Sequence, residues 1–225
     1  MRQNQNGIIF FQRDVWICFS ASFFLLYFGG FFIGLLVQSF SPSLSYAQVY
    51  YIPAIIAQGI PVVYLAYRYG RISFSDFKLI GSDVIVLFIT LIIVFAYIGL
   101  ITLKGPYKPY TFRGEKLSQL SRIGSYIFIF NLVIWGPLLE EIFFRKYILE
   151  IFNFRINVVW ALLLTSSLET ILHIGYVETT KDIPRLIPIF LIFVALSFIY
   201  LKSRLGVTFI AHSLLNGLLL NISWG

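Results

Sequence analysis

Ionisable side chains are rare in the apolar stretches of this sequence, and the few that occur there could do chemistry. Three of the ten acidic residues lie inside long apolar runs, namely Glu140, Glu141 and Glu169. The two histidines of the chain, His173 and His212, lie in such runs as well. A charged side chain at the centre of a membrane helix costs about 2.5–3.5 kcal/mol on insertion scales. Each of these residues is therefore a candidate functional residue.

Helical spacing would bring these residues together with further polar side chains. Three pairs are each four positions apart, so that both members share a helix face: Glu141 with Arg145, Glu169 with His173, and His212 with Asn216. Each pair taken alone could satisfy itself or join two helices. Together they predict a catalytic centre where three helices converge. In it Glu141 pairs with Arg145, and Glu140, rotated by about 100°, stays available.

The chemistry that these residue types allow is hydrolysis. A carboxylate can take a proton from water, an imidazole can orient that water or protonate the leaving group, and an Asn amide with an imidazole can stabilise an oxyanion. Alternatively, His173, His212 and a carboxylate such as Glu140 could hold a zinc ion with an open position. The sequence does not decide between the two. It contains no His-Glu-x-x-His helix, no Gly-x-Ser-x-Gly elbow and no Gly-Lys-Ser/Thr phosphate loop.

The sequence Gly136-Pro137 precedes the two adjacent glutamates and is separated from them by Leu138 and Leu139. A proline removes a backbone donor and is best tolerated in the first turn of a helix. We therefore expect the helix to be interrupted here, with Glu140 and Glu141 in the opening turn of a new helix, where its dipole favours carboxylates.

The elements that position these residues are predicted to be membrane helices. Hydrophobic residues make up 59% of the 225 residues and charged residues 12%, with a mean hydropathy of +0.86, whereas soluble domains carry about 25% charged residues. We predict an all-α, polytopic transmembrane helix bundle of about seven (six to eight) helices, forming one domain over 1–225 with a polar catalytic cavity within the membrane. The expected spans are 15–37, 47–67, 83–103, 123–148, 156–174, 185–201 and 206–223.

The net charge of +7 is compatible with nucleic acid or anionic lipid as partner, and the positions of the basic residues favour membrane lipids over nucleic acid. The Lys and Arg residues lie between the apolar runs, which is typical of loops that meet anionic headgroups. Their distribution favours an N-terminus on the cytoplasmic side. The longest polar connection runs from Lys104 to Arg122, and the one cysteine, Cys18, has no partner for an intrachain disulfide.

In this order and spacing the polar residues resemble the CPBP intramembrane proteases, also called the CAAX protease and bacteriocin-processing, or Abi, family. The motifs are Glu140-Glu141-x-x-x-Arg145, a histidine that closes the next apolar segment (His173), and His212-x-x-x-Asn216. The resemblance covers a catalytic core at residues 123–222. It implies that Glu140 activates water with help from His173, that His212 and Asn216 stabilise the oxyanion, and that Glu141 and Arg145 support the site.

The resemblance also implies a substrate class and a location. Members include endopeptidases that remove the last three residues after a lipidated cysteine, and bacterial relatives linked to peptide processing and bacteriocin self-immunity. We therefore expect an apolar, lipidated or membrane-associated peptide or protein as substrate. The family's distribution and the Phe, Ile, Tyr and Asn richness indicate a multi-pass protein of a bacterial cell membrane. Metal dependence is disputed in the family, so the metalloprotease description stays open.

The sequence departs from the family pattern at two positions. Glu169 stands where the second motif usually carries Phe, and Lys146 stands where a small residue often follows the motif arginine. The Glu169 carboxylate could hold the His173 imidazole, add a metal ligand, or point to a polar gap without a catalytic role.

The leading hypothesis is an integral-membrane peptidase. The alternative from another class is a non-catalytic immunity or scaffold protein that keeps the protease fold. A small transporter fits less well, because the two halves of the chain show no pair of repeated broken helices. The sequence leaves the oligomeric state unknown.

Overall fold

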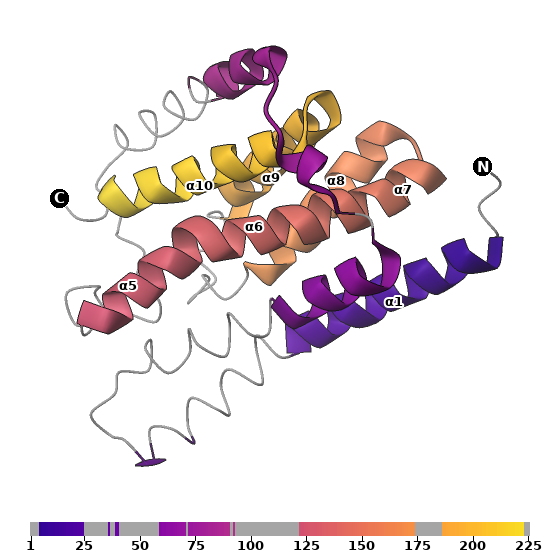
Figure 1. Ribbon diagram of the computed structural model, residues 1–225, viewed down its shortest axis with the longest axis horizontal. Coiled ribbons are helices and arrows are strands. Elements are labelled where there is room, and N and C mark those ends of the chain that lie inside the picture. The colour runs from indigo at the N-terminus through magenta and orange to yellow at the C-terminus, as the bar shows by residue number, and fades with distance from the viewer. Residues whose placement is uncertain are drawn as a thin grey trace.

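Every regular element in the described part of the chain is helical. The computed structural model describes residues 5–24, 36, 39–40, 59–70, 72–90, 92, 122–173 and 186–222. Figure 1 shows one long helix across the middle of a bundle, with α10 (Leu205–Ile222) on one side of it and α1 (Gln5–Phe24) on the other. Because these residues contain no strand, the predicted all-α fold is confirmed.

The long central helix runs without interruption through five consecutive segments. They are α5 (Arg122–Phe130), the π-helical η4 (Asn131–Trp135), α6 (Gly136–Glu140), the π-helical η5 (Glu141–Leu149) and α7 (Glu150–Arg155). Within the described residues, its stretch Ser125–Arg155 is the one helix long and apolar enough to cross a membrane. Of its two π-helical segments, η4 precedes Glu140 by one helical turn and η5 begins with Glu141. Short π-helical segments occur frequently at functional sites.

The helix does not break at Gly136-Pro137, so that prediction was wrong. The amide of Gly136 donates to the carbonyl of Asn131, five residues earlier, and Gly136 keeps helical angles (φ −57°, ψ −58°). This wide turn accommodates the missing N–H and the ring of Pro137. A Cβ at Gly136 would lie 2.8 Å from the carbonyl oxygen of Asn131, so the turn requires glycine. Glu140 and Glu141 therefore lie in mid-helix, away from any dipole at a helix start.

Three further helices pack against the long helix in the C-terminal half. α8 (Val158–Leu172) begins after Asn157, whose side-chain oxygen accepts a hydrogen bond from the Val159 amide at 2.8 Å. α9 (Leu186–Lys202) packs beside α8, and a two-residue turn then leads into α10. The short turn makes α9 and α10 neighbours. These three helices lie close to the expected spans 156–174, 185–201 and 206–223.

A short 3₁₀ helix, η2 (Phe74–Phe77), packs against the start of α10. A Cβ at Gly206 would lie 2.7 Å from the carbonyl oxygen of Phe77, so the two backbones touch. Lys146 of the long helix lies 3.5 Å from the Asp76 carboxylate of the same turn. The turn therefore fixes the beginning of the helix that carries His212 and Asn216.

A polar cluster joins α1 to the helix of residues 59–69 around the buried Asp14. Its Oδ2 accepts hydrogen bonds from the hydroxyls of Tyr69 (2.7 Å) and Tyr64 (3.3 Å) and lies 2.9 Å from Nε of Arg68. Arg13 pairs with Oδ1 at 3.2 Å. The Tyr69 hydrogen bond, with smaller contributions from Arg13 and Arg68, lowers the pKa of Asp14 below its ordinary value, although burial opposes this shift.

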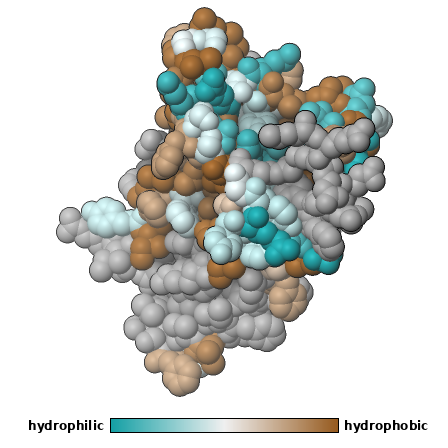
Figure 2. All heavy atoms as spheres, turned by 45° about the vertical axis from the view of Figure 1, so that its right-hand side comes forward, coloured by the Kyte–Doolittle hydropathy of each residue, from teal (hydrophilic) through white to brown (hydrophobic). Residues whose placement is uncertain are grey.

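Large apolar side chains cover much of the outer surface of the described helices. Trp160 on α8 and Leu191 and Phe198 on α9 are exposed, and Figure 2 shows hydrophobic residues spread between separate hydrophilic groups on one face. Four shorter apolar helices accompany the long one: Gly81–Thr90, Val158–Leu172, Leu186–Lys202 and Leu205–Leu218. The polar connection at 104–121 and much of the predicted spans 15–37, 47–67 and 83–103 lie outside the described residues.

Candidate active site

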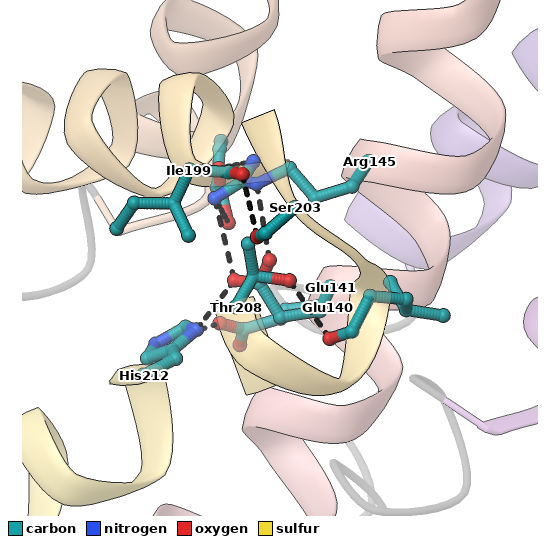
Figure 3. Close-up of polar contacts among 9 residues, drawn as sticks. Glu140, Glu141, Arg145, Ile199, Ser203, Thr208 and His212 are labelled. Carbon is teal, nitrogen blue, oxygen red and sulfur yellow. Dashed lines mark hydrogen bonds and ion pairs between the residues drawn. The ribbon is translucent and has the colours of Figure 1, made fainter. Parts of the chain in front are cut away.

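The polar residues singled out in the sequence converge from three helices. Glu140, Glu141 and Arg145 lie on the long helix, where α6 continues into η5. His212 lies on α10 and points toward both glutamates (Figure 3). Glu169 reaches the same cluster from α8. The expected convergence of three helices is therefore present.

A fully buried arginine forms the centre of the cluster. Nε of Arg145 lies 3.1 Å from Oε2 of Glu141, and Nη2 lies 3.3 Å from Oε1 of that residue. This confirms the pairing predicted from the spacing of four residues. Arg145 also donates to both carboxylate oxygens of Glu169, from Nη1 and from Nη2 at 3.2 Å. Because all three side chains have no exposed surface, the charges depend on one another for stabilisation.

His212 joins the buried ion pair to the neighbouring glutamate. Its Nδ1 lies 2.9 Å from Oε1 of Glu141, and its Nε2 lies 3.7 Å from Oε2 of Glu140. Glu141 pairs with Arg145 and is therefore an acceptor-only carboxylate, which assigns the proton of the imidazole to Nδ1. Nε2 is then the ring nitrogen without a proton. It faces Glu140 and can accept a proton.

The two adjacent glutamates lie in different environments, as the rotation between them predicted. The Glu141 side chain is completely buried, whereas 17% of the Glu140 side chain is exposed. A water molecule can therefore reach the Glu140 side chain from the protein surface, whereas the Glu141 side chain is closed off.

His173 lies at the C-terminal end of α8, one side chain away from His212. Its Nδ1 lies 2.9 Å from the backbone oxygen of Glu169. The ring of Phe193, on α9, contacts both imidazoles, with centroid separations of 4.9 Å to His173 and 6.0 Å to His212. The structure thus brings both histidines into one region and places an aromatic ring against each.

The Glu169 carboxylate does not hold the His173 imidazole, contrary to one expectation from the sequence. Both of its oxygens bind Arg145, and His173 contacts the Glu169 backbone. The sequence could not show this, because the spacing within α8 says nothing about which residue of the long helix packs opposite.

Asn216 has a hydrogen-bond partner on the long helix. Its Nδ2 donates to the carbonyl of Leu132 at 2.9 Å. In the π turn, the Leu132 carbonyl would accept from the amide five residues later, but that residue is Pro137 and has no N–H. Asn216 therefore supplies the donor that the proline removes. This bond uses one of the two N–H groups of the amide.

Residues 122–218 match the family model described as "Type II CAAX prenyl endopeptidase Rce1-like". The match confirms the resemblance of this part of the chain to the CAAX protease family. The matched region contains the helices that carry the whole polar cluster. No curated protein and no solved structure matches the chain.

The match to the Rce1-like model supports an intramembrane protease. The family consists of intramembrane proteases built as membrane helix bundles, and the apolar helices described above agree with that architecture. The match and the apolar helices together support an integral membrane protein that acts on peptides or proteins.

Phe193 is the residue of this Rce1-like site that sequence reasoning missed. Its side chain is 3% exposed and contacts both histidines. The neighbouring sequence gives no signal for this role, because Phe193 is one apolar residue among many in the apolar run of α9.

The donor set expected for zinc is not assembled in the described residues. No three His, Cys, Asp or Glu side chains lie there in an arrangement that could hold a metal ion. His212 directs Nδ1 to Glu141, and Nδ1 of His173 contacts a backbone oxygen. We therefore assign no step of the chemistry to a metal.

Proposed function

We propose that the chain is an intramembrane endopeptidase in which Glu140 activates the attacking water. The observation that carries this proposal is the difference between the carboxylates of the cluster. Glu141 and Glu169 are fully buried and bound to Arg145, whereas Glu140 is partly exposed and lies beside Nε2 of His212. A general base must reach its water, and Glu140 is the carboxylate of this cluster that can do so.

The proposed reaction is hydrolysis by one activated water molecule. Glu140 takes a proton from the water while the water oxygen bonds to the carbonyl carbon of the scissile peptide, and the carbonyl electrons move to the oxygen. The C–N bond then breaks, and the proton held by Glu140 passes to the leaving amine. This returns Glu140 to the carboxylate form and yields a new carboxyl end and a new amino end.

We assign the remaining polar groups to the water and the oxyanion. His173 orients the water together with Glu140. His212, when both ring nitrogens are protonated, and the second N–H of the Asn216 amide donate hydrogen bonds to the developing oxyanion. Glu141 and Arg145 hold the ring of His212 in place from the buried side.

The proposed substrate is an apolar, lipidated or membrane-associated peptide or protein. The broad apolar surface of the helices suits a substrate that arrives through the lipid phase. We further propose a location in a bacterial cell membrane, and peptide processing or bacteriocin self-immunity as the biological role.

The proposal predicts that cleavage depends on Glu140 and His173. Purified wild type in lipid nanodiscs should cleave a prenylated peptide of the form Cys followed by three residues, and Glu140→Gln and His173→Ala should lose about 100-fold or more in kcat. Glu150→Gln makes the same chemical change two helical turns along the same helix, where Glu150 accepts from the Tyr200 hydroxyl at 2.8 Å, and serves as control. Wild-type cleavage by Glu140→Gln would contradict the mechanism. A cellular phenotype that survives both substitutions at equal expression would support the non-catalytic immunity or scaffold alternative.

The zinc alternative has a separate test. We expect purified active protein to contain less than stoichiometric zinc and to keep its cleavage rate after stringent chelation. Stoichiometric zinc, together with activity that chelation abolishes and zinc restores, would overturn the metal-free assignment.

A further inference from the structure

The Glu169 carboxylate connects α8 to the reacting part of the site through a chain of short contacts. It binds Arg145, Arg145 binds Glu141, and Glu141 contacts Nδ1 of His212 at 2.9 Å. We propose that Glu169 is a positioning residue, which fixes Arg145 so that Glu141 holds His212 in its working orientation. This inference rests on the proposed function, because it concerns the same reaction.

The guanidinium of Arg145 donates hydrogen bonds to two carboxylates. Its guanidinium has five N–H groups in a rigid plane. Nη2 donates to Oε1 of Glu141 and to Oε1 of Glu169, and Nη1 donates to Oε2 of Glu169. Nε lies 3.1 Å from Oε2 of Glu141 as an ion-pair contact without hydrogen-bond geometry. Glu169 therefore holds the end of the guanidinium plane that Glu141 does not hold, and a two-sided grip of this kind fixes orientation as well as distance.

Oε1 of Glu141 contacts both Arg145 and His212, so it links the orientation of the guanidinium to that of the imidazole. Oε1 of Glu141 is 3.3 Å from Nη2 of Arg145 and 2.9 Å from Nδ1 of His212. A rotation of the guanidinium therefore moves the acceptor that orients the imidazole. Nε2 of the same ring lies 3.7 Å from Oε2 of Glu140, so the disturbance reaches the proposed general base.

Glu169→Gln would replace one of the two acceptor oxygens by an NH2 group, so that one donor of Arg145 loses its acceptor inside a site without exposed surface. Buried donors without an acceptor are costly, so the guanidinium would turn toward the carboxylates that remain, which are Glu141 and Glu140. Either movement disturbs the reaction: Glu141 is drawn away from His212, or Glu140 is drawn away from its water.

The experiment compares Glu169→Gln with Thr170→Val in nanodiscs. Glutamine keeps the size of the side chain and one acceptor but removes the charge. Thr170 is the next residue of α8, and its hydroxyl donates to the Ser166 carbonyl of its own helix at 2.7 Å. We expect Glu169→Gln to lower kcat about 10- to 100-fold with KM changed less than about threefold, since a misplacement of about 1 Å costs about 100-fold. Thr170→Val should stay within about twofold of wild type for both constants.

A spectroscopic measurement separates positioning from a purely structural role. The chain has two histidines, so protein labelled with ¹⁵N-histidine gives two sets of ring signals, which His173→Ala assigns. We expect wild-type His212 to show the Nδ1–H tautomer. Glu169→Gln should change the His212 signals in the same direction as Glu141→Gln does, whereas Thr170→Val should leave them unchanged.

The outcomes are distinct from those that test the proposed function. Unchanged His212 ring signals in Glu169→Gln overturn the inference, whether kcat falls or not. A lower kcat without a change in these signals indicates that Glu169 has a purely structural role. Cleavage that survives Glu140→Gln overturns the proposed function and leaves the test at His212 intact. If Glu169→Gln does not fold, Glu169→Asp retains the charge with a shorter reach, and it should show the same changes in the signals and in kcat, with wild-type signals overturning the inference.

Discussion

Asn216 replaces the hydrogen-bond donor that Pro137 removes from the long helix. The Leu132 carbonyl accepts from Nδ2 of Asn216 at 2.9 Å, and the backbone position that would otherwise serve it in the π turn is a proline. At the scale of single residues, the third motif therefore has a structural task in addition to the proposed stabilisation of the oxyanion. The bond ties α10 to the turn that leads into Glu140.

This compensation predicts a non-additive pair of substitutions. Asn216→Ala should lower the free energy of unfolding by about 1–3 kcal/mol, because it leaves a carbonyl without a partner. In a Pro137→Ala background a backbone N–H returns, so the same substitution should cost clearly less. The measurement is a double-mutant cycle of unfolding in one detergent. Equal costs of Asn216→Ala in both backgrounds would show that the two residues are not coupled.

Contacts of the site within one helix could be predicted from the sequence, whereas contacts between helices could not. The Glu141–Arg145 pair and the separate environment of Glu140 follow from helical spacing. The Glu169–Arg145 contact and the ring of Phe193 depend on how α8 and α9 pack against their neighbours. The π turn before Pro137 could not be read either, because proline is compatible with a break, a kink or a wide turn.

At the scale of elements, α1 is joined to the helix of residues 59–69 through Asp14. The folded state lowers the pKa of this carboxyl, chiefly because the Tyr69 hydroxyl donates to it and the two arginines favour its charge. A group whose pKa is lowered by folding stabilises the folded state above its unfolded pKa, which is about 3.9 for Asp. That contribution is lost as the pH falls through the lower folded pKa.

The Asp14 cluster therefore predicts a pH-dependent difference between two proteins. Asp14→Asn should be less stable than wild type at pH 7. The difference should shrink as the pH falls below about 4, where the unfolded wild-type chain takes up a proton at Asp14 before the folded protein does. Thermal unfolding of both proteins at pH 7, 5, 4 and 3 measures the difference. A gap that stays constant over this range would contradict the role given to the Asp14 charge.

The elements themselves were largely predictable from the apolar runs. α8, α9 and α10 lie close to their expected spans, because a long apolar stretch bounded by polar residues has few alternatives to a helix in a membrane. The start of α1 was not predictable, since Gln5 to Asp14 is not uniformly apolar. The spans at 15–37, 47–67 and 83–103 remain predictions for their parts outside the described residues.

At the scale of the whole molecule, a membrane environment explains both the low share of charged residues and their gathering in one buried cluster. Charged residues make up 12% of the chain, and several of them are gathered in one buried cluster that joins three helices. A membrane protein keeps such costly groups inside the bundle, where they can pair. The Rce1-like match over 122–218 covers this part of the chain and agrees with that interpretation.

The measurement that tests the central claim most directly is the single-turnover rate of peptide cleavage with enzyme in excess. Wild type, Glu140→Gln and Glu150→Gln in nanodiscs would be mixed with a prenylated peptide, and the products followed by mass spectrometry. We predict one cleavage product from wild type and Glu150→Gln at similar rates, and a rate at least about 100-fold lower from Glu140→Gln. Cleavage by Glu140→Gln at the wild-type rate would contradict the claim that Glu140 activates the water.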